Sequence, residues 1–310
     1  MEIDYDSLFY FVDNFCLGFE PWYKKQLLSE KSKKRERSGH LSLSEILTIL
    51  LAYHQSGMAC FKYFYLTLQR TQRSLFPKLV HYARFVKLIG HAFPALVCLL
   101  KSLMGEGTEY LFIDSTPMPV CHIRREKNHK VFKGLAAKGK TSTGWFFGMK
   151  LHMIFNVKGE LVRLVITPGN VNDRTPVRDM VRGLVGKLIG DKGYLSQKLF
   201  EDLFQNGVKL ITKIKKNMKN CLMDTTERLM LMRRSFIETI FSSLKALNTL
   251  IHSRHRNPLN AFVHLIAGLI NYQLRDDKPS LQNILLLTRV QKISATHFIK
   301  AILKSLWIQS

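Results

Sequence analysis

Three acidic residues of this chain have the types and positions that metal-assisted phosphoryl chemistry requires. Asp114 and Asp191 each follow a short apolar run, and Glu238 lies in a later helical stretch. Cleavage of a phosphodiester bond without a covalent enzyme intermediate needs an activated water and a stabilised leaving oxygen. Two Mg²⁺ ions about 4 Å apart supply both. Mg²⁺ prefers oxygen ligands and takes one or two carboxylates with phosphate and water, so these acids are candidate catalytic and metal-binding residues.

The first two acids occur in similar surroundings. Asp is depleted inside strands, yet Asp114 follows Leu111-Phe112-Ile113 directly; a turn-capping Asp would give the same pattern. Asp191 stands between Gly190 and Lys192-Gly193, and such small neighbours allow close backbone approach to a ligand, although an ordinary turn would also use them. Each acid alone is weak evidence, and the combination of the three is more specific.

The third acid gains support from helical geometry. At 100° per residue, Arg234, Glu238 and Lys245 fall within about 40° of one another on a helix expected over residues 226–251. An exposed Arg–Glu pair at i, i+4 would look the same. The opposite side of this helix is apolar, with Phe236, Ile240, Leu244, Leu247 and Ile251.

A fourth acid competes for the second metal position. Asp173 follows Asn172 and precedes Arg174-Thr175-Pro176, where a helix is expected to begin. A helix-capping role explains it without a metal, so Asp173 ranks below Asp191.

The charge balance indicates a polyanionic partner. Lys and Arg outnumber Asp and Glu by 47 − 23 = 24 over 310 residues, and nucleic acid is the usual partner of so basic a protein. Basic clusters occur at residues 24–37, 124–140 and 209–219. A membrane partner is disfavoured because residues 257–274, the longest uncharged stretch, contain several polar side chains and suit a buried core helix better. Five scattered cysteines suit a reducing cytoplasm, not a disulfide framework or a zinc site.

The pattern of elements predicts a helical region followed by an α/β domain. Ser42 and Glu45 form a capping box at the start of one helix, and Gly57 is expected to end it. From residue 106 on, apolar runs and turn signals alternate. The expected helices are residues 61–70, 81–103, 175–184, 196–206 and 226–251, and the expected strands are 110–114, 145–157, 161–167, 187–189 and 208–212.

At this point the motifs resemble those of a known family. The chain resembles bacterial insertion-sequence transposases of the DDE type, most closely the group numbered nine-eighty-two, from its N-terminal helical part to about Leu274. Leu231 departs from the family's Tyr-x2-Arg-x3-Glu-x6-Lys signature, where Tyr would stand. The motifs are Phe112-Ile113-Asp114-Ser115, Gly148-Met149-Lys150-Leu151-His152, Thr167-Pro168-Gly169-Asn170-Val171-Asn172-Asp173, Gly190-Asp191-Lys192-Gly193-Tyr194 and Arg234-x3-Glu238-x6-Lys245.

The resemblance implies an α/β fold with an RNase H-like mixed sheet flanked by helices. Residues 1–105 would be an all-α DNA-binding region, 106–274 the catalytic domain and 275–310 an atypical tail. Asp114 would lie on the first strand, Asp191 after the fourth, and Glu238 on the helix after the fifth. These acids would hold two Mg²⁺ ions, for which Mn²⁺ could substitute. The implied DNA contacts are Lys150, His152, Arg234 and Lys245, to which the basic cluster adds Arg124 and Arg125.

The implied activity is transposition: binding of the transposon ends, metal-dependent cleavage, and transfer of the freed 3′ hydroxyl to target DNA. The partners would be terminal repeats and target DNA, with no membrane, and pairing of two ends implies a homodimer acting in the bacterial cytoplasm at the nucleoid. Two alternatives stay open, an RNase H-like nuclease without strand transfer and a decayed transposase that only binds DNA. Truncation after about Asp277 is expected to leave nicking intact.

Overall fold

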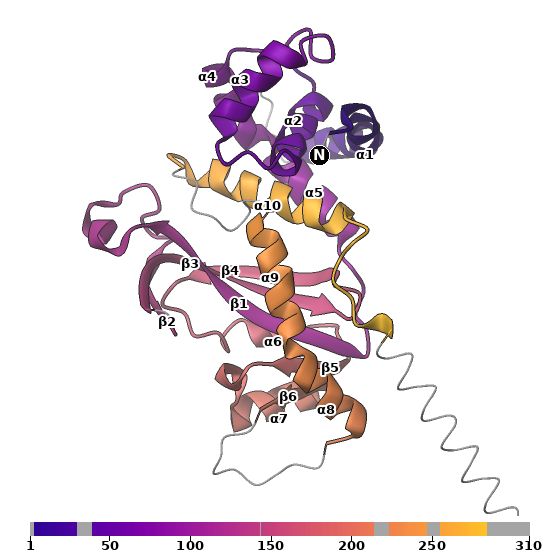
Figure 1. The fold of residues 1–310 in the computed structure, drawn as a ribbon, viewed down its shortest axis with the longest axis vertical. Coiled ribbons are helices and arrows are strands. Elements are labelled where there is room, and N and C mark those ends of the chain that lie inside the picture. The colour runs from indigo at the N-terminus through magenta and orange to yellow at the C-terminus, as the bar shows by residue number, and fades with distance from the viewer. Residues whose placement is uncertain (1–2, 30–38, 143, 214–222, 247–254, 284–310) are drawn as a thin grey trace, which may run out of the picture.

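The computed structural model describes residues 3–29, 39–142, 144–213, 223–246 and 255–283. Helices come first, a six-stranded sheet follows, and further helices end the described chain (Figure 1). The helices are α1 (Tyr5–Ser29), α2 (Leu43–Gln55), α3 (Phe61–Thr71), α4 (Tyr82–Leu88), α5 (Phe93–Leu103), α6 (Val177–Met180), α7 (Gln197–Gln205), α8 (Thr225–Met232), α9 (Phe236–Ala246) and α10 (Pro258–Leu274). The strands are β1 (Tyr110–Cys121), β2 (Ala137–Thr141), β3 (Gly144–Asn156), β4 (Leu161–Pro168), β5 (Gly186–Gly190) and β6 (Val208–Thr212), and the 3₁₀ turns are η1 (Ile89–Ala92), η2 (Ile123–Asn128), η3 (Lys192–Tyr194) and η4 (Arg233–Ser235).

The sheet is mixed. Its path is β2-β3-β1-β5-β6, and β4 pairs with β3 beyond the stretch that pairs with β2. When β2 is set aside, the order is β4-β3-β1-β5-β6, with antiparallel pairs on one side of β1 and parallel pairs on the other. The expected fold class, a mixed sheet flanked by helices after an all-helical N-terminal region, is confirmed.

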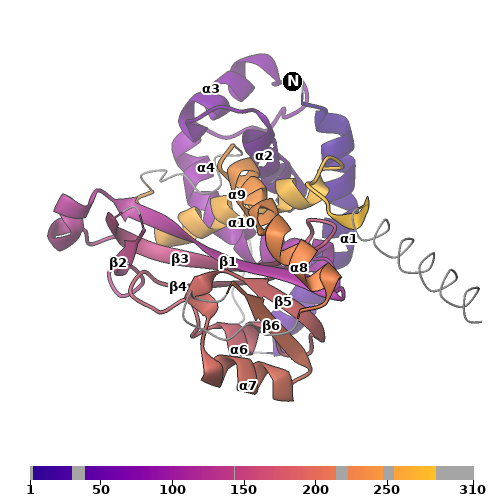
Figure 2. The same cartoon turned by 60° about the horizontal axis from the view of Figure 1, so that its bottom comes forward.

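The two faces of the sheet bury separate cores. Alternate side chains of a strand point to opposite faces, so Phe112 joins the large core shared with the N-terminal helices, while Leu111 and Ile113 join a smaller core with α6 and α7. Figure 2 shows α6 and α7 below the sheet, with α9, α10 and the N-terminal helices above it. We call these the α9 face and the α7 face.

Strand β1 is longer than the sequence predicted. It was expected to end at Asp114, but it continues to Cys121 through Pro117 and Pro119. β3 pairs with β1 over nearly its whole length, whereas β5 pairs only with Tyr110–Phe112. Beyond Phe112 the other edge of β1 has no ladder partner, and proline is tolerated at such an edge. Asp114 therefore lies inside a strand, beside an open edge.

Several other predicted elements are corrected. α1 and β2 were not predicted, and β2 occupies part of the basic segment taken as a loop. The helix predicted over residues 175–184 is reduced to Val177–Met180. The one predicted over 226–251 is broken by η4, which re-aims α9 so that Phe236 and Ile240 are buried. Leu247 and Ile251 lie outside the described residues, as do parts of the basic clusters at 24–37 and 209–219.

The apolar segment at residues 257–274 forms the buried helix that was expected. α10 packs on α2 and α5, and its polar side chains are bonded: the Asn271 amide donates to Leu51 O, and the Gln273 amide donates to Leu103 O. The N-terminal helices and α10 thus share one core, and the proposed division of the chain at residue 105 stays a prediction. In the described part of the chain, one helical stretch, Tyr82–Leu103, is long and apolar enough to span a membrane by length and composition; here it consists of α4, η1 and α5, and α5 packs on α10.

The first residues of the predicted tail pack on the β3–β4 turn. Leu281 is buried, and its backbone N–H donates to Val157 O at 2.7 Å. The carbonyl of Pro279 lies so close to Gly159 that a Cβ there would be 2.1 Å away. The tail thus begins inside the fold, while residues 284–310 lie outside the described part.

We expect truncation after Asp277 to lower the free energy of unfolding by about 2 kcal/mol, because it removes one buried leucine and its contacts. Truncation after Asn283 keeps Leu281 and should leave stability unchanged. Urea unfolding of the two truncated proteins beside the full chain measures the difference. Equal midpoints for both truncations would show that Leu281 contributes nothing.

Candidate active site

The sheet register places Asp114 beside Asp191. In the parallel β1–β5 pair, Phe112 is opposite Ile189, an offset of 77 residues (189 − 112). The two acids have the same separation, 77 residues (191 − 114), so each lies two positions beyond this matched pair. Asp191 keeps extended backbone angles, with φ −72° and ψ 168°. Neighbouring strands are about 4.8 Å apart, so the two carboxylates start side by side on the α9 face.

Helix α9 brings the third acid to the same face. The Phe236 ring meets the Phe112 ring edge-on at 5.2 Å, which anchors the start of α9 on β1 next to Asp114. Arg234, just before α9, then bridges two acids: its guanidinium lies 3.3 Å from Asp114 Oδ2 and 3.2 Å from Glu238 Oε1. The Arg–Glu pair and the approach to Asp114 therefore occur together. Glu238 is 63% exposed, so its carboxylate faces solvent.

Burial raises the pKa of Asp114 to about 6. Desolvation is the main cause; the Ser115 N–H and the Arg234 guanidinium oppose it, and the negative charges of Asp191 and Asp173 add to it. A carboxylate kept partly protonated by its surroundings has a strong electrostatic demand for a cation. Such perturbed acids are typical of functional sites.

The glycine before Asp191 serves a different purpose from the one predicted. A Cβ on Gly190 would lie 3.1 Å from the Tyr194 ring and 3.3 Å from Ile113. Gly190 is therefore small because a buried aromatic ring packs on it, not because a ligand approaches it. A Cβ on Gly193 would meet nothing within 4 Å. Tyr194, which the sequence argument did not single out as a site residue, is held beside the acids by this packing.

Lys150, His152 and Asp173 lie toward the α7 face. His152 is opposite Ser115 in the β1–β3 ladder, and Asp114 is opposite Met153. Since side chains alternate along a strand, Lys150 and His152 point away from the face that carries Asp114. Lys150 donates to Asp173 at 3.0 Å and to Val171 O at 2.9 Å. This ion pair gives Asp173 a structural role, as the sequence analysis allowed.

His152 is fully buried and hydrogen-bonded to the Thr167 hydroxyl at 2.8 Å. Desolvation lowers the pKa of His152 to about 4, so the ring is neutral at physiological pH. A ring without exposed surface cannot touch DNA in this conformation. The geometry gives His152 a packing role between β3 and β4, and its expected DNA contact is not carried forward.

The remaining predicted DNA contacts are exposed. Lys245 lies near the end of α9, and Arg124 and Arg125 lie in η2 between β1 and β2. Next to this arm the structure adds a residue that the sequence reasoning missed. Trp145 is 58% exposed, and the amines of Lys138 and Lys140 lie 5.2 and 5.5 Å from its ring. The signal was an aromatic residue in a basic segment, a combination found where bases stack on proteins.

The donor set of the site suits a hard divalent cation in part. Asp114 and Asp191 offer carboxylate oxygens on one face, and Mg²⁺ needs only one or two carboxylates from a protein. Among the described residues, no three of His, Cys, Asp and Glu come together as a metal-binding group, because Arg234 lies between Asp114 and Glu238. The pair therefore fits a cation, and Glu238 would join it once the guanidinium moves aside. The four described cysteines are free thiols.

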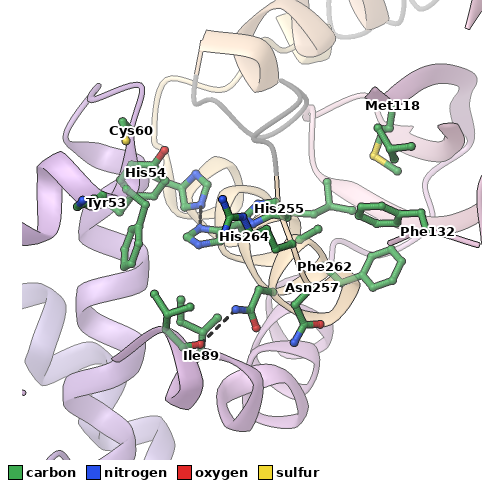
Figure 3. A pocket seen from close by; sticks show the side chains of 18 of the residues that line it. Tyr53, His54, Cys60, Ile89, Met118, Phe132, His255, Asn257, Phe262 and His264 are labelled. Carbon is green, nitrogen blue, oxygen red and sulfur yellow. Dashed lines mark hydrogen bonds between the residues drawn. The ribbon is translucent and has the colours of Figure 1, made fainter. Parts of the chain in front are cut away.

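A separate pocket of about 580 Å³ lies between the helices and β1 (Figure 3). Its centre holds His264, whose Nδ1 is 3.4 Å from His54 Nε2, and Met118 lies on its far side. Met118 is four residues beyond Asp114, about 13 Å along an extended strand. Burial and the neighbouring histidines lower the pKa of His264 well below its ordinary value. The lining is aromatic and imidazole-rich, so this pocket is not the acid site.

The fold and the adjacent acids define a protein of the metal-dependent phosphoryl-transfer class. A family model described as a transposase DDE domain matches residues 104–258, which is half of the chain, and the chain belongs to that family. No curated protein sequence matches it. A solved structure, the cryo-EM structure of a piggyBac transposase synaptic complex with hairpin DNA, is similar with 10% identity and a TM-score of 0.41, covering 79% of this chain and 70% of that one. An overlap at that level says nothing about the site.

Proposed function

We propose that this chain is a DNA transposase that cuts and joins phosphodiester bonds at a divalent-metal site formed by Asp114, Asp191 and Glu238. The observation that carries the proposal is the equal register of Asp114 and Asp191 on adjacent parallel strands. Two carboxylates side by side on one face are what a hard cation requires, and membership of the DDE family gives the reaction class.

The chain's own residues have separate tasks in this proposal. Asp114 and Asp191 would hold Mg²⁺ or Mn²⁺, which when bound activates a water and stabilises the leaving oxygen. Glu238 would provide the third carboxylate. Arg234 neutralises Asp114 and Glu238 before the cation arrives. Once displaced from them, its planar guanidinium is suited to a phosphate of the cut strand.

DNA is the proposed partner because the net charge is +24 and exposed cations flank the acid site. Lys245 lies seven residues beyond Glu238 on α9, about 10 Å along the helix axis. Arg124 and Arg125, with Trp145, would contact DNA farther from the cut. Pairing of two transposon ends makes a homodimer part of the proposal, with the bacterial nucleoid as its place of action. Assignment to group nine-eighty-two rests on the quoted motifs.

A joining assay tests the proposed function against its two alternatives. The donor is a duplex made from the DNA that flanks the coding sequence, the acceptor is a supercoiled plasmid, and Mg²⁺ or Mn²⁺ is supplied. We expect metal-dependent nicking at the donor end and covalent donor–plasmid products. Nicking without joined products would identify a nuclease, and salt-sensitive binding without cutting would identify a decayed transposase.

A further inference from the structure

Tyr194 is the buried polar group that the proposed chemistry does not use. It ends η3, three residues after Asp191, and its side chain is 2% exposed. The ring packs on Gly190 and joins the core of the α7 face with Ile113. These contacts hold the ring in place, so the position of the phenol oxygen is set by packing.

The hydroxyl of Tyr194 is buried without a hydrogen-bond partner in the described part of the structure. An unsatisfied buried donor costs about 1–3 kcal/mol, so its retention needs an explanation. Its surroundings provide one: burial and the charges of Asp114, Asp173 and Asp191 raise the pKa of Tyr194 well above its ordinary value. The phenol therefore stays protonated, and it is a donor surrounded by acceptors.

We propose that Tyr194 is a positioning residue for the acid pair, whose hydroxyl donates a hydrogen bond to the Asp114 carboxylate when a divalent cation replaces Arg234. Among the three acids, Asp114 has the largest effect on the phenol. Metal-binding carboxylates are themselves held by outer hydrogen bonds, and loss of such a partner weakens metal binding or activity about 10–100-fold. The inference rests on the proposed function, because it needs a cation at Asp114.

The test is Mn²⁺ binding to the full-length protein, followed by titration calorimetry and by the loss of the free Mn²⁺ paramagnetic resonance signal. We expect Tyr194→Phe to fold with unchanged or higher thermal stability, because an unsatisfied hydroxyl is removed, and to bind Mn²⁺ about 10–100-fold more weakly. The control is Tyr63→Phe, since Tyr63 is 70% exposed on α3 and should bind Mn²⁺ as the wild type does.

A second variant guards against misfolding. Gly190→Ala places a methyl group 3.1 Å from the Tyr194 ring and should weaken Mn²⁺ binding by displacing the hydroxyl. Unchanged Mn²⁺ affinity in a folded Tyr194→Phe protein would overturn the positioning role while leaving the proposed function intact. If Asp114→Asn binds Mn²⁺ as well as wild type does, the cation site itself is elsewhere, and both proposals fail.

Discussion

Asp114→Asn is expected to stabilise the metal-free protein by about 2–3 kcal/mol above pH 7 and to abolish metal-dependent cleavage. The pKa of this carboxyl is raised from 3.8 to about 6 because it is desolvated. One pKa unit corresponds to about 1.4 kcal/mol, and the Asp114 side chain is 21% exposed, so only a small discount for solvent screening applies. Asparagine has nearly the same shape and carries no charge to desolvate.

The sign of this effect sets its pH dependence. A folded-state pKa above the unfolded value means that the folded protein holds the proton more tightly, so stability is greatest below pH 3.8 and is lost as the pH rises through 6. Wild type and Asp114→Asn should therefore unfold alike near pH 4 and diverge above pH 6. Denaturant unfolding in the presence of a chelator, measured across this range, gives the difference.

The matched control is Asp179→Asn on α6, where the aspartate is 69% exposed and pairs with Arg182. Substitution there should change stability by no more than about 0.5 kcal/mol at any pH. If Asp114→Asn destabilises the protein at pH 8 while the control does not, Asp114 is held by favourable contacts and is not strained by burial. The electrostatic account of the site would then be wrong.

His152 is expected to make the fold sensitive to acid. Desolvation lowers its folded-state pKa from 6.5 to about 4, so the unfolded chain binds a proton that the folded chain refuses. The stabilising contribution is complete above pH 6.5 and is lost as the pH falls toward 4, with a total of about 3 kcal/mol. This loss adds to any from other titrating groups.

Comparison with His152→Gln isolates this contribution. Glutamine keeps a polar atom for the Thr167 hydroxyl but does not titrate, so the fall in unfolding free energy between pH 6.5 and 4 should be smaller by about 3 kcal/mol. His40→Gln, at an exposed position, should follow the wild-type curve. A wild-type slope in His152→Gln would mean that His152 is protonated in the folded protein.

The sequence predicted the sheet and the acid pair because both depend on local pattern. The apolar runs before Asp114 and Asp191 are strands buried on both faces, and such strands read as continuous hydrophobic stretches. The 77-residue spacing was available from the sequence, but its meaning was not. Only the β1–β5 register shows that this spacing equals the strand offset and places the acids level.

What the sequence could not predict depends on contacts between distant segments. Neither a helical wheel nor a motif shows that Arg234 reaches back 120 residues to Asp114. Likewise, Lys150 and His152 resemble DNA contacts in a motif, but strand alternation turns them to the other face. Tyr194 read as part of a turn, and its importance follows from a burial that only the packed structure shows.

The central claim is metal-dependent phosphodiester cleavage at the Asp114–Asp191 pair. Nicking of supercoiled plasmid in Mg²⁺ or Mn²⁺, by wild type beside Asp191→Asn, tests it most directly. Both proteins are first shown to be folded and to bind DNA. Loss of metal catalysis costs several kcal/mol, so the variant should nick at least about 10³-fold more slowly than wild type. Nicking by Asp191→Asn at the wild-type rate would contradict the account.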